Sequence, residues 1–348
     1  MRGTGSYGYV NALVRGQIGN LLKLYDYEAI LGCTRPSDIA HVLSRTTYGQ
    51  MVARTTPESF ADLREAVTSA ASKSAESFIA SSPDSARIVL EDFRLLLESR
   101  SIVNSLKLRF NQNDLVTSSG AIPLGAIPLG AIPSKYYELP SESQGRGHIE
   151  TIQDSGLARV IRESLETARR CGCVAPLLRI LIYCGERSLD RISEVSSEDL
   201  TSTLRPINSM IDAANLEIVL TSIQCGIEPQ TVRSWLFSQR GTLDGVIEGA
   251  LGFRDIVQLL AWLRDSRYGP CLEAKSEETV DDLLNRLPYC LMRREARSVL
   301  SGYPFRASTV AAGMMLKLLE IRNLRLAVAG ASGGLGRAAA LRLMVFPQ

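Results

Sequence analysis

Several features that define large classes of proteins are missing from this sequence. The 348 residues include only two histidines, His41 and His148, and this scarcity excludes most catalytic and metal sites built on histidine. No apolar segment approaches the roughly 20 residues that cross a bilayer; the longest spans 174–185. The first residues lack the apolar stretch of a signal peptide. We therefore expect a cytoplasmic protein with no membrane span of its own.

A strong charge of one sign and the loops of nucleotide-hydrolysing enzymes are also missing. The net charge is +2, whereas nucleic-acid-binding domains carry a clearly basic face, so we expect no nucleic-acid partner. The chain has no Gly-x-x-x-x-Gly-Lys-Ser/Thr loop. We accordingly predict no catalytic residue, no cofactor and no metal ligand, and a protein that is not an enzyme.

The seven cysteines are scattered along the chain and odd in number. Cys171 and Cys173 stand two positions apart, but no second pair of Cys or His follows at the spacing of a zinc site. A disulfide framework is not expected in a cytoplasmic protein either. We therefore expect the cysteines to serve as small, buried apolar side chains.

The sequence is rich in the apolar spacing of helices. Apolar residues recur at steps of three and four over 7–110 and again from 152 onward, and sustained alternation of period two is absent. The fold class is therefore predicted to be all-α, and the length suggests two or three domains. We also expect the main helices to be rigid, with no proline or glycine inside them.

The C-terminal stretch from residue 303 has two incompatible interpretations. In the first, a strand runs into the glycine-rich loop Gly330–Gly336, which would bind the pyrophosphate of NAD(P). That motif needs a second strand and an acidic residue about twenty positions further on, yet no acidic residue follows Gly336. In the second, Ser308 caps a long helix to Ala329 with one apolar face, and a turn at 330–334 leads to a short helix. We favour the second interpretation.

An internal repeat supports the helical interpretation. Two copies contain an acid, an asparagine three residues later and a glycine eleven residues after the asparagine: Asp212, Asn215 and Gly226, then Glu320, Asn323 and Gly334. A fainter copy has Asn104, with Ser101 in place of the acid. The three asparagines thus recur at nearly equal intervals along the chain, and a repeat of this kind outweighs an isolated motif.

A second signature is a helix that ends in Tyr-Gly, at Tyr48 and again at Tyr268. Together the two signatures predict three helical modules, at 1–112, 113–222 and 223–348. The second module begins with a low-complexity loop, 118–134, in which GAIPL is repeated. Its three prolines and three glycines exclude a helix there.

These features resemble the C subunit of A-type and V-type ATPases (ATP synthases), the counterpart of the d subunit of the eukaryotic V-ATPase. The resemblance rests on Acid-x-x-Asn-Leu at 212–216, on the Tyr-Gly helix ends and, most specifically, on PFRASTVAAGMMLKLLEIRNLR at 304–325. The departures are Ser101, the GAIPL insertion and the poorly matched stretch 120–170. The resemblance implies an all-α fold of three pseudo-symmetric helical modules, arranged as a funnel-like three-fold repeat.

The resemblance also implies a mechanical function. Such a protein is a non-catalytic central-stalk (rotor) component that couples the axle of the ATP-hydrolysing or ATP-synthesising head to the membrane rotor ring during proton or sodium ion transport. Its partners are the proteolipid subunits of the ring and the central axle subunits. It lies on the cytoplasmic side of the membrane, as a peripheral part of a membrane-bound complex. Two other hypotheses remain open: an NAD(P)-dependent oxidoreductase using Gly330–Gly336, and a generic helical-repeat adaptor.

Two groups of residues are functional candidates. We expect the repeat residues to hold packed helices in register through local polar networks: Asn104, Asp212, Asn215, Gly226, Glu320, Asn323, Gly334, Tyr48 and Tyr268. Possible interface residues are the aromatic and basic side chains Tyr7, Tyr9, Arg15, Arg322 and Arg325, because such residues are enriched where subunits meet. For the first three, a packed aromatic cluster with a solvated arginine is the favoured interpretation.

Overall fold

The fold is described from a computed structural model of the chain. The described residues are 4–111, 155–195, 200–237, 244–273 and 278–347. The predicted low-complexity loop 118–134 lies outside these ranges. Within them every regular element is a helix and no strand occurs, which confirms the predicted all-α class.

The chain up to residue 111 forms a succession of helices that begin where the sequence offers a start signal. They are α1 (Thr4–Gly19), α2 (Leu24–Leu31), α3 (Pro36–Ser44), α4 (Gly49–Thr55), α5 (Phe60–Ala80) and α6 (Asp84–Asn111). Pro36 occupies the first turn of α3, where its missing N–H is not needed. Ser59 and Asp62 form a capping box at the start of α5, in which each side chain accepts the other's backbone N–H.

The part from residue 155 to 273 combines long helices with several short ones. They are α8 (Ser155–Cys171), the 3-10 turn η2 (Ala175–Leu178), α9 (Arg179–Val195), α10 (Leu200–Gln224), α11 (Pro229–Arg233), α12 (Gly245–Ala250), α13 (Ile256–Leu263) and α14 (Gly269–Leu272). Asp244 and Asp255 cap α12 and α13 by accepting backbone N–H groups, so two short helices have well-defined beginnings.

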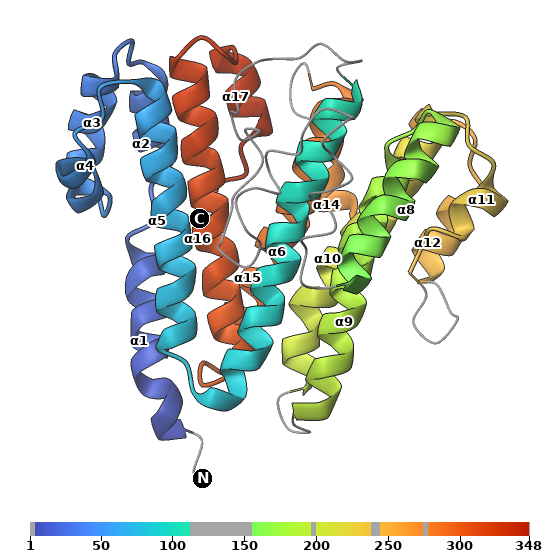
Figure 1. Ribbon diagram of the computed structural model, residues 1–348, viewed down its shortest axis with the longest axis horizontal. Coiled ribbons are helices and arrows are strands. Elements are labelled where there is room, and N and C mark those ends of the chain that lie inside the picture. Colours follow the sequence, from blue (N-terminus) through green and yellow to red (C-terminus); the bar gives the residue numbers. More distant parts are fainter. Residues whose placement is uncertain (1–3, 112–154, 196–199, 238–243, 274–277, 348) are drawn as a thin grey trace.

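The last part contains α15 (Val280–Leu300), α16 (Ala307–Ala331) and α17 (Arg337–Leu343). Every residue of α16 from Ala307 to Ala329 is buried, and the helix contacts α1, α2, α5, α6, α10, α15 and α17. Figure 1 shows it between α5 and α15. The prediction that one apolar face of this helix is buried therefore missed the burial of its other faces, because a helix enclosed on all sides has no solvent face. We call α16 the central helix.

The ends of the central helix also differ from the prediction. Its N-cap residue is Arg306, which makes no side-chain capping bond, and not Ser308. Gly330 still belongs to the helix, and the turn begins at Ser332. Helix therefore occupies 324–331, where the dinucleotide interpretation requires a strand, so that interpretation is wrong.

The expectation that the main helices contain no proline or glycine was also wrong. The prolines inside long helices are Pro206 of α10 and Pro288 of α15. A Cβ on Gly313 of α16 would lie 2.8 Å from Cγ1 of Val14 in α1, and one on Gly330 would lie 2.5 Å from Cδ2 of Leu31 in α2. These glycines therefore let the N-terminal helices approach the central helix more closely than alanine would permit.

One pair of cysteines departs from the expected free, apolar role. Cys271 of α14 and Cys290 of α15 are joined as a disulfide, with their Cα atoms 5.5 Å apart. The expectation that no disulfide forms was wrong for this pair, because the packing of α14 on α15 brings the two side chains together. Cys173 and Cys184 are free and buried, as expected, whereas Cys33 and Cys171 are half-buried and Cys225 is exposed, so the expected burial was wrong for these three.

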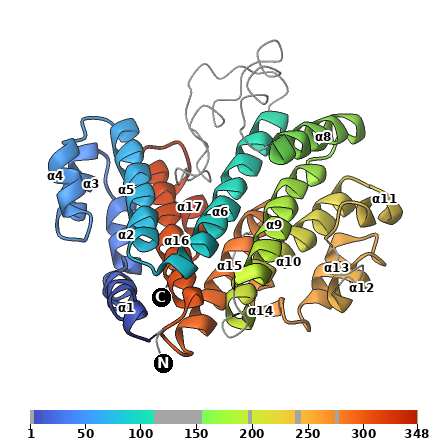
Figure 2. The ribbon, with the colours of Figure 1, turned by 60° about the horizontal axis from the view of Figure 1, so that its bottom comes forward.

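The short helices lie at opposite edges of the molecule. Figures 1 and 2 show α3 and α4 at one edge and α11 and α12 at the other, with the long helices between them. Segments from the two ends of the chain are neighbours, since α1, α2 and α5 all contact α16. The module boundaries near 112 and 222 and the three-fold arrangement stay predictions.

Candidate functional site

The long helices α10 and α16 each carry one asparagine that hydrogen-bonds the segment following the helix. Asn323 donates through Nδ2 to the carbonyl of Val345 (2.8 Å) and accepts the N–H of Val345 through Oδ1 (3.2 Å). Asn215 makes the same two bonds with Phe237, at 3.1 and 3.0 Å. The partner lies 22 residues downstream in both cases. An amide that satisfies both backbone groups of one residue fixes the returning segment in a single register, and we call these pairs the asparagine clamps.

Three residues before its clamp, the central helix carries a buried carboxylate. Glu320 is fully buried; its Oε1 accepts the N–H of Leu22 (2.6 Å), and its Oε2 accepts the hydroxyl of Tyr48 (2.7 Å). The same oxygen forms an ion pair with Lys317, whose Nζ lies 4.6 Å from the centroid of the Tyr48 ring. The Tyr27 hydroxyl donates to the backbone carbonyl of Glu320 (3.4 Å). We call Tyr27, Tyr48, Lys317 and Glu320 the Glu320 cluster.

Burial controls the protonation of the tyrosines in this cluster. Desolvation raises the pKa of Tyr27 and Tyr48 well above its ordinary value, and the charge of Glu320 raises it further. Both hydroxyls therefore stay protonated and keep donating hydrogen bonds. The bonds from Glu320 to Tyr48 and Leu22 span 272 and 298 residues of sequence, so the cluster ties the first helices of the chain to the central helix.

The corresponding acid of α10, Asp212, is partly open to solvent. Its Oδ2 accepts from Nη2 of Arg267 (2.7 Å), and that nitrogen also donates to the Tyr268 hydroxyl (2.7 Å). Arg267 pairs in addition with Asp244 (3.3 Å), the N-cap of α12. The side chains of Asp212 and Arg267 are 24% and 49% exposed. We call Asp212, Asp244, Arg267 and Tyr268 the Asp212 cluster.

The Asp212 carboxyl titrates in an unusual range. Desolvation raises the pKa of Asp212 to about 6, an increase that Arg267 opposes and Asp244 supports. Desolvation also raises the pKa of Tyr268, with the charge of Asp212 as the second cause. Asp212 is consequently a mixture of protonated and charged forms near pH 6.

The two clusters belong to two copies of one structural unit. The chain reads EAILG at 28–32 and EGALG at 248–252, and the two segments begin at the same distance before their Tyr-Gly, at Tyr48 and Tyr268. In the first copy Tyr48 donates to Glu320, and in the second Arg267 donates to both Asp212 and the Tyr268 hydroxyl. We call α2–α4 with α16–α17 the terminal unit, because it joins both ends of the chain, and α10–α14 the inner unit.

The turn after each long helix contains a glycine in the left-handed region. Gly226 has a φ of 67°, as the sequence suggests. In the terminal unit the left-handed residue is Gly333, with a φ of 78°, one position before the predicted Gly334. Both turns therefore depend on a conformation that glycine adopts without strain.

The fainter third copy is only partly visible. Asn104 of α6 donates to the Tyr289 hydroxyl at 3.4 Å, and the position equivalent to Phe237 and Val345 in this copy lies outside the described residues. Sequence reasoning missed a second link of α6: Arg100 and Lys107 both pair with Glu217 of α10 at 2.5 Å. Burial acts to raise the pKa of Glu217, but the two cations outweigh it and the pKa lies below its ordinary value. This ion-pair network joins α6 to α10.

The possible interface residues fall into two groups. Tyr9 and Arg15 of α1 are exposed and Tyr7 is half-buried, and Arg15 donates to the carbonyl of Leu300 (3.3 Å). Arg322 and Arg325 are buried within the chain. Arg322 donates to the carbonyls of Leu343 and Asn285 and lies over the Tyr289 ring. The expectation that these two arginines face a neighbouring subunit is therefore not supported.

The described ranges contain neither a metal-binding group of three or more His, Cys, Asp or Glu side chains nor a helix with the length and apolar character of a bilayer span. The buried polar groups described above instead make contacts between helices. Fold and clusters together define the class: an all-helical protein assembled from repeated helical units.

The family can be stated as well. The family described as ATP synthase (C/AC39) subunit matches residues 10–341, and the chain belongs to it. The protein is thus a subunit of an A/V-type ATP synthase, which replaces the hypothesis of an unrelated helical-repeat adaptor. No curated protein matches the chain significantly.

Proposed function

We propose that this chain is a non-catalytic rotor subunit of the central stalk. It couples the axle of the ATP-hydrolysing or ATP-synthesising head to the ring of membrane proteolipid subunits during proton or sodium ion transport. It acts on the cytoplasmic side, as a peripheral component of the membrane-bound complex. The observation that carries this proposal is the family match over 10–341, which includes the inner unit, the central helix and all of the terminal unit but the last residues of α17.

The packing around the central helix supports a mechanical role. A part that transmits torque must resist deformation, and close-packed interiors have low compressibility. Residues 307–329 of α16 are enclosed on every side by helices from both ends of the chain. The Glu320 cluster fixes α2 and α4 to this helix, and the clamp of Asn323 fixes the C-terminal segment to it. A load applied to either end of the chain therefore reaches the same rigid element.

The exposed face of α1 is the surface that we assign to a neighbouring subunit. Tyr9 is 72% exposed, and Arg15 is exposed on the same helix. Large aromatic and arginine side chains supply much of the binding energy at protein interfaces. Replacing Tyr9 by Ala is therefore expected to weaken assembly of the complex while leaving the fold unchanged.

The coupling role is tested by depletion and restoration. Membranes that carry the complex are stripped of this chain, and ATP hydrolysis and ATP-driven ion uptake are measured before and after the purified chain is added back. We expect the stripped complex to hydrolyse ATP without ion uptake, and the wild-type chain to restore uptake. Ion uptake that persists at full rate without the chain contradicts the coupling role. ATP hydrolysis is also measured in the isolated head, which lacks the ring. If the head stops hydrolysing ATP when this chain is removed from it, the non-catalytic role is contradicted.

A further inference from the structure

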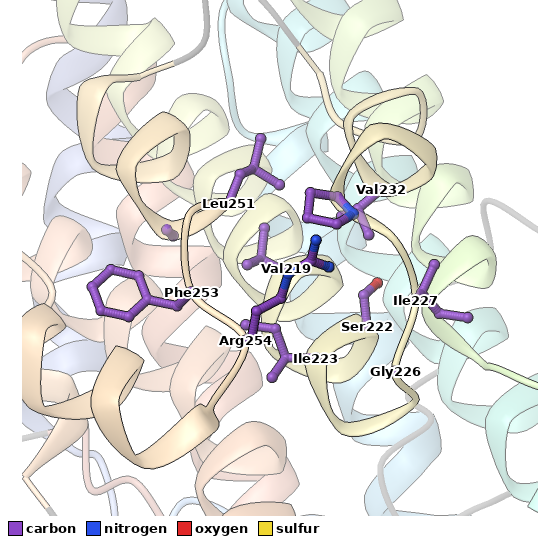
Figure 3. Close-up of a pocket in the computed structure, with 11 residues that line it drawn as sticks. Val219, Ser222, Ile223, Gly226, Ile227, Val232, Leu251, Phe253 and Arg254 are labelled. Atoms are coloured by element: carbon purple, nitrogen blue, oxygen red, sulfur yellow. The ribbon is translucent and has the colours of Figure 1, made fainter.

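The inner unit contains a cavity that the proposed coupling role does not use. It has a volume of about 240 Å³ and lies between α10, α11 and the connection from α12 to α13. Figure 3 shows its walls, which are mainly apolar: Val219, Ile223, Ile227, Val232, Leu251 and Phe253. Two polar side chains, Ser222 and Arg254, also line it.

Comparison with the terminal unit explains why the space exists. The aligned segments EAILG and EGALG place Ala250 where the terminal unit has Ile30, a side chain that is fully buried. Aligning the two clamp asparagines also aligns Ser222 with Gly330, against which Leu31 and Ala340 pack tightly. The inner unit therefore lacks the isoleucine of its counterpart, and the smaller Ala250 leaves a void when the backbone is held in place. Ser222 is the larger member of its pair and adds a hydroxyl that Gly330 lacks.

The polar groups of the cavity point to a ligand. Ser222 is fully buried, and its Oγ has no hydrogen-bond partner, although buried hydroxyls almost always have one. Figure 3 shows this hydroxyl projecting from α10 among the lining side chains, with the Arg254 guanidinium over the same space. Arg254 pairs with Glu228 at 3.2 Å, and the two side chains are 64% and 75% exposed. An exposed pair of this kind is weak, so an incoming carboxylate can compete for the guanidinium.

We propose that this cavity binds a small free monocarboxylate with an apolar body. The apolar body packs against Val232 and Leu251, and the carboxylate accepts hydrogen bonds from Arg254 and from the buried Ser222 hydroxyl. A cavity of about 150 Å³ accommodates benzene, so the present volume accommodates about ten non-hydrogen atoms. That size fits an arylacetate or a medium-chain fatty acid and is too small for a peptide.

Binding to the cavity can be measured by the fluorescence of the chain's own tryptophans. Its two tryptophans are Trp235 and Trp262. Trp235 lies three positions after Val232, and the Trp262 ring centroid is 5.3 Å from that of Phe253. Tryptophan fluorescence of the full chain is titrated with phenylacetate and with phenylacetamide, which has the same shape without the charge. We expect saturable binding of phenylacetate with a Kd of about 0.1–1 mM, and binding of the amide that is weaker by about tenfold or more.

Four variants locate the site, and circular dichroism with thermal melting checks that each is folded. Ala250→Ile introduces the residue of the terminal unit and is expected to abolish binding. Arg254→Gln is expected to weaken phenylacetate binding by about tenfold and to leave phenylacetamide binding unchanged; Arg254→Lys recovers part of the loss. Ser222→Ala, which removes only the hydroxyl, is expected to weaken binding by about threefold.

Three results overturn the proposal: no saturable signal up to about 10 mM phenylacetate, equal affinity for the acid and the amide, or unchanged binding by folded Ala250→Ile. None of these results bears on ion uptake by the restored complex, so the proposal stands or falls independently of the coupling role.

Discussion

The terminal and inner units place the same pattern of residues in opposite environments. Glu320 is fully buried and accepts hydrogen bonds from Tyr48 and from the backbone of Leu22. Asp212, at the equivalent position of α10, is 24% exposed and bound to an arginine that is 49% exposed. An acid three residues before an asparagine therefore does not by itself define a core site. The elements that cover the long helix decide whether the acid becomes an internal anchor or a surface ion pair.

The largest difference between the two units is expected when the acid is removed. Glu320→Ala leaves the buried Lys317 ammonium, the Tyr48 hydroxyl and the Leu22 N–H without their acceptor, and should lower the free energy of unfolding by about 3–5 kcal/mol. Asp212→Ala breaks a partly exposed pair and should lower it by about 1 kcal/mol or less. Urea denaturation of both variants measures the comparison. Equal losses would show that burial does not distinguish the two clusters.

The asparagine clamps should show a smaller contrast in the same direction. Asn323→Leu leaves the backbone N–H and carbonyl of the buried Val345 unsatisfied, at a loss of about 2–4 kcal/mol. Asn215→Leu affects Phe237, which is only half-buried, at a loss of about 1–2 kcal/mol. Both variants should lose thermal stability more than affinity for the axle subunits. An unchanged melting temperature with lost binding would mean that these asparagines contact a partner instead.

A third comparison concerns Ser222, which lines the cavity of the inner unit, and Gly330, its counterpart in the terminal unit. Gly330→Ala places a methyl group against Leu31 and Ala340, and the overpacking outweighs the gain in helix propensity, for a net loss of about 1 kcal/mol. Ser222→Ala removes a buried hydroxyl that has no partner and should be neutral or stabilising by up to about 1 kcal/mol. Thermal melting compares the two variants. A stabilising Gly330→Ala would show that the terminal unit has unfilled space at this point.

The smallest expected effect is the pH dependence of the free energy of unfolding that comes from Asp212 in the inner unit. The pKa of Asp212 is raised to about 6 in the folded protein, so between its unfolded value near 4 and about 6 the folded state binds more protons. Stability from this group is therefore present below about pH 4 and is lost as the pH rises to about 6. Allowing for partial exposure, the loss is about 1 kcal/mol. Asp212→Asn should remove it.

The measurement is the difference in unfolding free energy between wild type and Asp212→Asn across this pH range. The matched control is Asp62→Asn, because Asp62 lies at an exposed helix start and its pKa is lowered by hydrogen bonds to Ser59. For Asp62 the stability contribution is present above its unfolded pKa and is lost as the pH falls. Between about pH 4 and 6 the Asp62 contribution is already fully present, so the Asp62→Asn difference should stay nearly constant while the Asp212→Asn difference changes with pH. A difference for Asp212→Asn that does not vary with pH would exclude the raised pKa.

The sequence predicted the repeated asparagines and the helical class better than it predicted which helices would cover them. The spacing of Asn215 and Asn323 pointed to two asparagines that each bond the backbone of a residue 22 positions downstream. The helical class followed from apolar periodicity. The complete burial of α16 could not be predicted, since several of the helices that cover it come from the opposite end of the chain.

Features that depend on long-range packing were also missed. The Cys271–Cys290 disulfide has no spacing signal and arises from the contact of α14 with α15. The partners of Asp212 come from a turn 55 residues later, and the sequence marked only Tyr268. The burial of Arg322 and Arg325 was missed because arginine is ordinarily a surface residue. The cavity becomes interpretable only when EAILG and EGALG are compared within the fold.

Hydrogen exchange of the full chain, followed by mass spectrometry, tests most directly whether the central helix is the rigid element of the molecule. Amides of 314–326, enclosed on all sides, should exchange only through global unfolding and be the slowest in the described part of the chain. Amides of α11–α13, at the edge of the inner unit, should exchange at least about tenfold faster. Exchange in α16 that is as fast as in α11–α13 would contradict the account, because a helix that opens locally cannot transmit torque between the ends of the chain.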